Sequence, residues 1–214
     1  MSTLPSMNRG KFIVLEGGEG AGKTTIAKAV ASAFPADRLL VTKAGETAFG
    51  EELKKMLVSE EGSNVSAEAQ FLLAWSAQTD HFQRVVSPAL SRGVSVFSDR
   101  FDSSIFAYQV TASGATYLSD LFWNVRDEAF KGATPDLYIF LDVPPEVGLA
   151  RVKKSGRVMD HFEKRSLDFH RTVREGYLEF FKSVPHKIID ATRPLAEVEA
   201  DVLALIRTHI RTQV

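Results

Sequence analysis

Short apolar runs alternate with longer segments of helical periodicity along this chain. Five runs are rich in Val, Ile, Leu and Phe, and they occupy Lys11–Glu16, Arg38–Thr42, Val94–Ser98, Leu137–Val143 and Lys187–Asp190. Continuous apolar runs of this length are typical of strands that are buried on both faces, and helices between them supply the cover. The pattern therefore predicts an α/β fold in which a five-stranded parallel sheet carries helices on both faces.

Between the strands, apolar residues recur at the three- and four-residue spacing of helices. We expect helices over residues 23–34, 51–57, 67–90, 104–131, 145–154, 164–182 and 195–212. Pro88 lacks a backbone N–H, so the long helix over 67–90 should end or kink there. The Ser113-Gly114 pair predicts a break in the segment over 104–131.

Composition narrows the class of protein. The chain has 214 residues, 44% of them hydrophobic and 25% charged, as in an ordinary globular protein. Its 26 basic and 27 acidic side chains leave a net charge of −1, which argues against binding nucleic acid through bulk charge. The absence of cysteine excludes disulfides and thiolate chemistry. No apolar stretch has the length of a membrane span and no secretory signal is visible, so we expect no membrane association and a cytoplasmic location.

The length predicts one domain over residues 1–214, with two segments of different character. Residues 1–10 carry no apolar core pattern and are expected to form a flexible tail. Residues 153–163 contain glycine, are charged and are poor in apolar side chains, so they are expected to form a mobile lid.

A glycine-rich motif follows the first predicted strand. Residues 17–25 read G-G-E-G-A-G-K-T-T, which contains G-x-x-x-x-G-K-T between a strand and a helix. Glycines let the backbone curl so that successive N–H groups point at phosphate oxygens, and the helix start adds its positive dipole end. Lys23 can reach the β- and γ-phosphates, and the Thr24 hydroxyl can bind Mg²⁺. The motif predicts binding of a nucleoside triphosphate with Mg²⁺.

A second candidate cluster, Asp99-Arg100, follows the third predicted strand. Because ligands of open α/β sheets bind at the carboxyl ends of the strands, both side chains should emerge toward the phosphates. A carboxylate there can orient Mg²⁺, and an arginine can bridge donor and acceptor phosphates. Nucleotide switches, motor-type ATPases and small-molecule kinases share the glycine-rich motif. The short chain and the charged segment over 153–163, which is suited to exclude water from a phosphoryl transfer, favour a kinase.

The residues after that strand resemble the signature of the thymidylate kinases. Residues 98–109 read S-D-R-F-D-S-S-I-F-A-Y-Q, and the family pattern is D-R-[YF]-x-x-S-x-x-A-Y. Three further segments agree in order and spacing: E-G-G-E-G-A-G-K-T-T at 16–25, P-D-L-x-x-x-L-D-V at 135–143, and D-H-F-E at 160–163, where the family usually has D-R-[FI]-E. The resemblance covers nearly the whole chain and implies the fold of a P-loop nucleoside monophosphate kinase.

The resemblance also implies an activity. Members of this family transfer the γ-phosphoryl group of ATP to a deoxynucleoside monophosphate, which here is expected to be dTMP, giving dTDP. A kinase for a modified pyrimidine or a purine monophosphate is the first alternative, and a P-loop ATPase or switch is the second. The family further implies a homodimer, for which the long helix over 67–90 can supply a face.

Individual roles follow from the same resemblance. Glu19 matches an acidic loop residue that approaches the acceptor sugar, and Arg100 matches the arginine that organises the acceptor phosphate. Tyr108 matches a tyrosine that packs against C2′, and Arg151 resembles a lid-side arginine that covers the adenine. The residues expected to hold ATP are Gly17, Gly18, Gly20, Ala21, Gly22, Lys23, Thr24, Thr25 and Arg151. Lys23, Asp99, Arg100 and Arg157 are expected to act in catalysis, and Thr24 and Asp99 to bind Mg²⁺.

The family also needs an arginine finger at the transferring phosphate. Some members carry it in the loop, but that position is Ala21 here, so the finger is expected from the lid. Arg157 is the first candidate because it is the only arginine between residues 153 and 163; the other cations nearby are Lys153, Lys154 and Arg165.

The acceptor side departs from the family pattern. Residues 42–47 read T-K-A-G-E-T where the family usually has T-R-E-P-G-G-T, and Lys54 replaces a phosphate-binding arginine. The arginine that reads thymine corresponds to Gln78, which can bond either a pyrimidine or a purine edge. The base is therefore left open between thymine and a larger base that fills the room beside Ala74. The residues expected to bind the acceptor are Glu19, Lys54, Ala74, Trp75, Gln78, Arg100, Ser104, Ile105, Tyr108 and Gln109.

Overall fold

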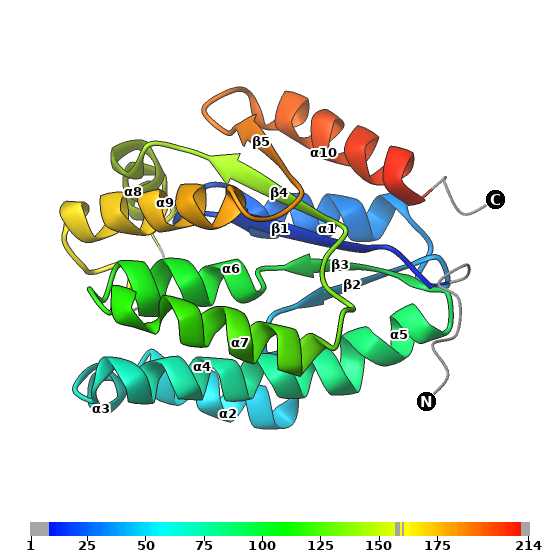
Figure 1. The fold of residues 1–214 in the computed structure, drawn as a ribbon. Coiled ribbons are helices and arrows are strands. Elements are labelled where there is room, and N and C mark those ends of the chain that lie inside the picture. Colours follow the sequence, from blue (N-terminus) through cyan, green and yellow to red (C-terminus); the bar gives the residue numbers. More distant parts are fainter. Residues whose placement is uncertain (1–8, 157–158, 160, 211–214) are drawn as a thin grey trace.

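A five-stranded parallel sheet forms the centre of the molecule (Figure 1). The computed structural model describes residues 9–156, 159 and 161–210. Strands β1 (Phe12–Gly17), β2 (Leu39–Lys43), β3 (Ser95–Asp99), β4 (Leu137–Asp142) and β5 (His186–Asp190) lie in the order β2-β3-β1-β4-β5. The α/β fold is confirmed, and each predicted strand agrees with an observed one to within one residue at either end.

Helical segments connect the strands. They are α1 (Lys23–Ala33), α2 (Ala48–Leu57), α3 (Glu60–Ser63), α4 (Ala67–His81), η1 (Phe82–Val86), α5 (Ser87–Ser91), α6 (Asp102–Ile105), η2 (Phe106–Thr111), η3 (Thr116–Leu118), α7 (Ser119–Phe130), α8 (Pro145–Lys154), α9 (Leu167–Phe181) and α10 (Leu195–Ile210). All seven predicted helical regions are present, and the break expected at Ser113-Gly114 falls between η2 and η3. The short helix α3 was not predicted, because four residues are too few to show a period.

The long helical region from Ala67 is less regular than its sequence suggests. The helix does not stop at Pro88 but runs on to Ser91, and a π-helical turn, η1, lies directly before the proline. A widened turn of this kind lets the helix continue although Pro88 has no backbone N–H to donate. The prediction of an end or kink at Pro88 was thus right about the position of the irregularity, but the irregularity is a π-helical turn and not a helix end.

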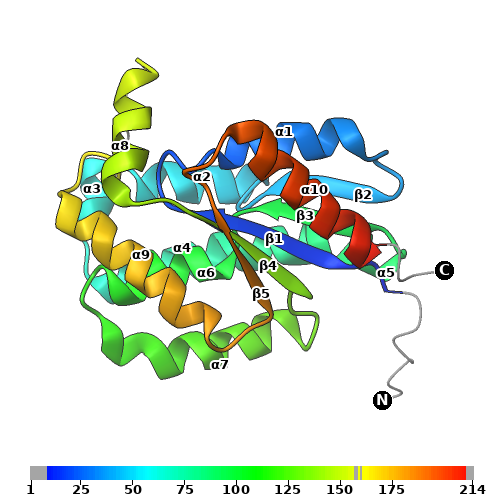
Figure 2. The same cartoon turned by 90° about the horizontal axis from the view of Figure 1, so that it is seen from above.

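The side chains of successive strand residues pack alternately into two hydrophobic cores, one on each face of the sheet. Phe12 and Val14 of β1 pack with α4, α7 and α9 on one face, and Ile13 and Leu15 pack with α1 and α10 on the other (Figure 2). This two-residue period is what a strand buried on both faces requires. Because the strands are parallel, their carboxyl ends meet at one edge, where the turns after β1, β2 and β3 lie together.

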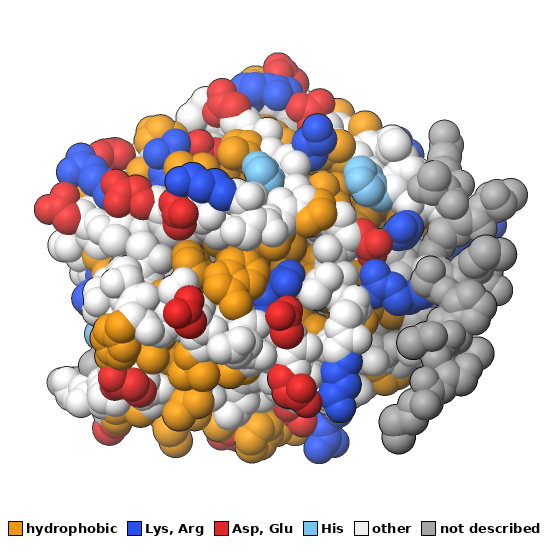
Figure 3. All heavy atoms as spheres, in the orientation of Figure 1, with side chains coloured by type: hydrophobic (Ala, Val, Ile, Leu, Met, Phe, Trp, Pro, Cys, Tyr) orange, Lys and Arg blue, Asp and Glu red, His pale blue; other side chains and the backbone are white. Residues whose placement is uncertain are grey.

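The outer surface carries both signs of charge. On the face seen in Figure 3, basic and acidic side chains are interspersed, as the net charge of −1 suggests. No helix in the described part of the chain is both long enough and apolar enough to cross a lipid bilayer.

Candidate active site

The loop between β1 and α1 curls around its own lysine. Gly20 and Gly22 have φ angles of 69° and 94°, which only glycine adopts without strain. The Lys23 ammonium donates hydrogen bonds to the carbonyls of Gly17 at 3.0 Å and Gly18 at 2.8 Å. Burial, reinforced by nearby Arg100, lowers the pKa of Lys23 to about 8.

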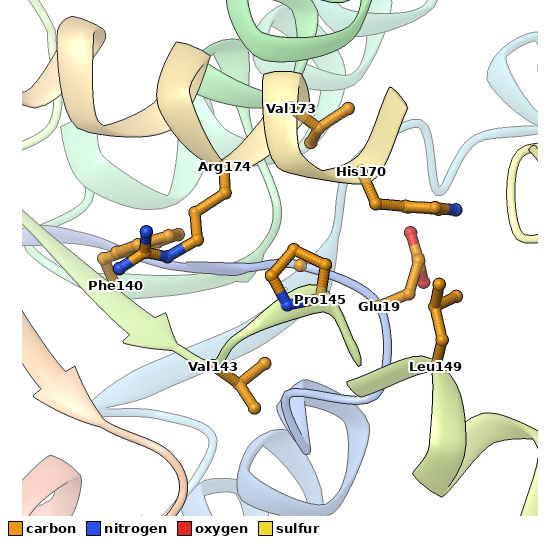
Figure 4. A pocket seen from close by; sticks show the side chains of 9 residues that line it. Glu19, Phe140, Val143, Pro145, Leu149, His170, Val173 and Arg174 are labelled. Atoms are coloured by element: carbon orange, nitrogen blue, oxygen red, sulfur yellow. The ribbon is translucent and has the colours of Figure 1, made fainter. Parts of the chain in front are cut away.

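Helix α8 packs its backbone directly on this loop. A Cβ added to Gly20 would lie 2.0 Å from the carbonyl oxygen of Gly148, and one added to Gly148 would lie 2.1 Å from that of Glu19. The Glu19 side chain points toward His170 of α9 beside a small cavity of about 10 Å³ (Figure 4). A space of that size holds at most one water molecule, so it belongs to the packing beneath the loop rather than to a substrate site.

Arg100 lies in the turn after β3 in a left-handed conformation, with φ 69°. Such a conformation costs a non-glycine residue about 1–2 kcal/mol and persists only where contacts enforce it. Its guanidinium donates to Glu19 at 2.9 Å, to Ser104 at 3.2 Å and to the Tyr177 hydroxyl at 2.8 Å. The side chain is therefore held in one orientation across the carboxyl edge of the sheet.

Glu19 forms the opposite side of this cluster. Its Oε1 accepts hydrogen bonds from Arg100 and from the Tyr108 hydroxyl, the latter at 2.7 Å. Burial alone would raise the pKa of Glu19, but the positive charges of Arg100 and Lys23 outweigh it and lower the pKa to about 2. Glu19 is consequently ionised at any physiological pH.

A second, fully buried carboxylate supports the turn from behind. Glu16 accepts hydrogen bonds from the Phe101 N–H at 2.8 Å and from the hydroxyls of Ser103 at 2.7 Å and Ser104 at 2.9 Å. Sequence reasoning assigned no role to Glu16 or to Tyr177. A charged residue closing a buried strand was the available signal for Glu16, whereas Tyr177 is one of several aromatic residues on an apolar helix face.

Two cavities open onto this cluster. One, of about 440 Å³, extends over the loop and is lined by Glu19, Gly20, Gly22, Lys23, Thr24, Thr25, Lys43, Asp99, Arg100, Arg151, Val152, Ser155 and Glu163. The other, of about 260 Å³, extends between β2, α2, α4 and η2, and is mostly apolar. Three residues line both cavities: Glu19, Lys43 and Arg100. The arrangement places a phosphate-binding loop and a second ligand cavity on either side of one charged boundary.

Comparison with known proteins agrees with this architecture. Residues 15–202 match the family model described as thymidylate kinase. The chain is 40% identical to a thymidylate kinase of Methylococcus capsulatus, with 97% of this chain and 96% of that protein aligned. It is 36% identical to a thymidylate kinase of Leuconostoc citreum, with 97% and 99% aligned. The chain belongs to the thymidylate kinase family.

Membership of the thymidylate kinase family makes the chain a phosphotransferase that uses ATP. It sets aside the nucleotide switch and the motor-type ATPase, which share the glycine-rich loop but not the remaining motifs. The resemblance noted in residues 98–109 and in the three accompanying segments is confirmed over nearly the full length.

Most residues expected on the acceptor side of a thymidylate kinase lie in the 260 Å³ cavity. Its lining includes Glu19, Lys54, Ala74, Gln78, Arg100, Ser104, Ile105, Tyr108 and Gln109. Trp75 does not reach it: the indole packs in the core against Phe122 at 5.2 Å and Phe130 at 5.8 Å between ring centroids. Successive helix positions point about 100° apart, so Trp75 faces away from the cavity that Ala74 lines. Trp75 therefore does not line the cavity that the other predicted acceptor residues share.

The donor side contains one segment that sequence reasoning missed. A further depression of about 560 Å³ joins Ala21, Gly22, Thr25 and Arg151 to residues 191–195, which connect β5 to α10. The Arg151 guanidinium donates to the carbonyl oxygen of Ala191 at 2.9 Å, which fixes it beside this connection. No motif in the sequence marked these residues. Arg157, the expected finger, lies outside the described residues.

Proposed function

We propose that the protein transfers the γ-phosphoryl group of ATP to the phosphate of dTMP, giving ADP and dTDP. The observation that carries this proposal is the contact of the two cavities at Glu19 and Arg100, one over the phosphate loop and one with room for a nucleobase. A kinase must bring donor and acceptor phosphates together at one point, and positioning with electrostatic stabilisation then supplies most of the catalysis.

On the donor side, the loop N–H groups and Lys23 bind the β- and γ-phosphates. Thr25 and Arg151 border the depression next to residues 191–195, where the adenosine fits. Lys23 can exchange its two carbonyl partners for phosphate oxygens, and a nearby phosphate would favour the ammonium form that burial disfavours.

Mg²⁺ fits the same cavity. Asp99 is buried, and its Oδ1 has no hydrogen-bond partner among the described residues, which is a cost unless a cation or its water meets it. Thr24 lines the cavity with Asp99 and contributes a hydroxyl. We therefore assign Mg²⁺ to Thr24 and Asp99; when bound, it neutralises charge on the phosphate oxygens.

On the acceptor side, Arg100 holds the acceptor phosphate and Glu19 approaches the sugar. Tyr108, held by Glu19, covers the C2′ side of the sugar, and Lys54 adds a cation to the cavity lining. The base occupies the cavity beyond them, between Gln78 and Gln109 on the polar side and Ala74 and Ile105 on the apolar side. Ser104 acts indirectly, since its hydroxyl is bonded to Glu16 and Tyr177.

Closure is assigned to residues 153–163 as a lid over one kinase domain, with Arg157 as the finger. Closing the site would exclude water and so favour transfer to the acceptor over hydrolysis. A homodimer remains a prediction from the family, and a cytoplasmic location remains a prediction from the sequence.

The test is ADP release measured across a panel of monophosphates. We expect ADP release to depend on the acceptor and to be fastest with dTMP. Arg100→Lys keeps the charge but loses the two-pronged geometry, and should lower kcat/KM for dTMP at least tenfold. Arg92→Lys, at an exposed residue after α5, is the matched control and should behave as wild type. ADP release that is equally fast without any acceptor would contradict the proposal.

A further inference from the structure

Lys43 is the third residue at the boundary between the two cavities, beside Glu19 and Arg100. We propose that Lys43 is a further catalytic residue, whose ammonium contacts the phosphoryl group as it passes from donor to acceptor. This inference rests on the proposed function, because it requires that both cavities are filled at once. Lys43 lies at the carboxyl end of β2, and β2 is the neighbour of β3, which leads into the Asp99-Arg100 turn.

The backbone of Lys43 is fixed at that point. Lys43 is the register partner of Asp99 in the β2–β3 ladder, and the next residue, Ala44, donates its N–H to the Asp99 carbonyl at 3.1 Å. The Glu46 carboxylate accepts from the Lys43 N–H at 2.9 Å and from the Thr42 hydroxyl at 3.0 Å, which closes the turn. The strand end therefore delivers a long, exposed side chain to the boundary from a rigid base.

Charge distribution distinguishes Lys43 from its neighbours. The Arg100 guanidinium is paired with Glu19, and the Lys23 ammonium is bonded to the loop carbonyls. Lys54, in the acceptor cavity, is paired with Glu51 at 3.0 Å. Within the residues that the structure describes, Lys43 has no acidic partner at ion-pair distance and its ammonium makes no hydrogen bond. Its charge is thus available to a ligand at the place where two phosphates meet.

The chemistry requires such a charge. An acceptor phosphate oxygen forms a bond to the γ-phosphorus while the bond from that phosphorus to the β-γ bridging oxygen breaks, and ADP carries away the electron pair. Negative charge spreads over the transferring oxygens and the bridging oxygen during this step. Lys43 gives up no proton; its ammonium stabilises that charge and also reduces the repulsion between donor and acceptor.

Steady-state kinetics of Lys43→Met and Lys43→Arg test the proposal, with Lys55→Met as the matched control. Lys55 is an exposed lysine of α2 that is paired with Glu52 and lines neither cavity. We expect Lys43→Met to lower kcat about 100- to 1,000-fold, in the range found for removal of one transition-state donor. KM values for ATP and dTMP should change less than about threefold, because the contact is strongest during transfer. Lys43→Arg should keep most of the activity, and Lys55→Met all of it.

Three outcomes would overturn the inference: a kcat of Lys43→Met within twofold of wild type, a raised KM for dTMP with unchanged kcat, or equal damage by methionine and arginine. Equilibrium binding of ATP and of dTMP to each variant verifies that both cavities still bind ligand. The wild-type arm separates this inference from the proposed function. If wild type shows no acceptor-dependent ADP release, the proposed function fails; if wild type turns over and Lys43→Met matches it, only the role of Lys43 fails.

Discussion

Gln78 presents its side-chain amide to the acceptor cavity from α4 and is only 3% exposed. Its Nε2 has no hydrogen-bond partner among the described residues, so the amide offers both a donor and an acceptor to a base. A neutral amide here stands where the family pattern has an arginine. Ala74, one turn earlier on the same helix, leaves room beside it instead of an aromatic plane.

Selectivity for dTMP should therefore be weaker than the family pattern implies. A hydrogen bond to a charged group contributes about 1.5–3 kcal/mol, against roughly 1 kcal/mol for a neutral one. Gln78→Arg should accordingly raise kcat/KM for dTMP by about 2- to 30-fold relative to wild type. The measurement compares dTMP, dUMP, a 5-hydroxymethyl pyrimidine monophosphate and dGMP, and Gln83→Arg, on the exposed side of η1, serves as control. Highly selective use of dTMP that survives Gln78→Ala would show that another residue reads the base.

After Gln78, Tyr177 is a second residue whose contribution to activity a single substitution can test. Its hydroxyl accepts from Arg100 and is bonded to Ser104 at 2.8 Å, although it comes from α9 and is fully buried. Arg100 Nη1 donates to this hydroxyl and, at the longer distance of 3.2 Å, to Ser104, so removing the hydroxyl takes away the shorter of the two bonds that hold this nitrogen. Tyr177 is thus a positioning residue, acting through Arg100.

Tyr177→Phe should lower kcat/KM for dTMP about tenfold, since one hydrogen bond to a charged group is lost. Tyr138→Phe is the matched control: Tyr138 is equally buried and donates to Asp102 at 2.6 Å, away from both cavities. Both variants should lose about 1–2 kcal/mol of unfolding free energy. A purely structural role for Tyr177 would give the two variants the same kinetics.

At the scale of elements, one buried histidine joins α4 to the end of β2. The Thr42 hydroxyl donates to Glu46, so the His81 ring donates to Thr42 from Nε2, at 2.9 Å, and Nδ1 is left unprotonated. Burial lowers the pKa of His81 to about 4, with Lys54 adding to the effect and the carboxylates of Glu46 and Asp80 opposing it. The contact fixes the turn that carries Lys43.

This contact makes stability depend on pH. An unfolded histidine has a pKa near 6.5, so between about pH 6.5 and 4 the unfolded chain binds a proton that folded His81 does not. The stabilisation is complete above about pH 6.5 and is lost as the pH falls toward 4, by about 3 kcal/mol in total. Urea unfolding of His81→Gln should show a smaller loss over this range than wild type. His186→Gln, at an exposed residue of β5, should follow wild type, and an unchanged slope in His81→Gln would contradict the assignment.

Elements were predictable where a single period governs them. Strands β1 and β4 are buried along nearly their whole length, and α10 buries Val198, Val202 and Ile206 at helical spacing, so the apolar pattern was enough to locate these elements. The π-helical turns η1 and η2 were not predictable, because a single widened turn leaves the three- and four-residue apolar spacing of the surrounding helix nearly unchanged. Trp75 shows the same limit for a side chain: only the helix phase decides whether position 74 or 75 faces the cavity.

At the scale of the whole molecule, the sequence could predict only those parts of the site that belong to recognisable motifs. The loop, Arg100 and the residues of α4 and η2 were identified because they belong to continuous patterns. Lys43, Glu16 and Tyr177 come from separate segments, and their meeting depends on the strand order β2-β3-β1, which the sequence does not state. The connection over residues 191–195 joins the site only because β5 lies next to β4.

Because the two cavities share only Glu19, Lys43 and Arg100 among their lining residues, donor and acceptor should each stabilise the fold. A ligand that binds only the folded state at 100 times its Kd adds about 2.7 kcal/mol, which for a chain of this size raises Tm by about 5–10 °C. We expect dTMP alone and ATP with Mg²⁺ alone to produce shifts of this order in thermal unfolding. EDTA should reduce the ATP shift and leave the dTMP shift intact, because Asp99 and Thr24 line only the donor cavity. Asp99→Asn should weaken the Mg²⁺ dependence without affecting dTMP, and a dTMP shift that EDTA abolishes would show that the metal belongs to the acceptor side instead.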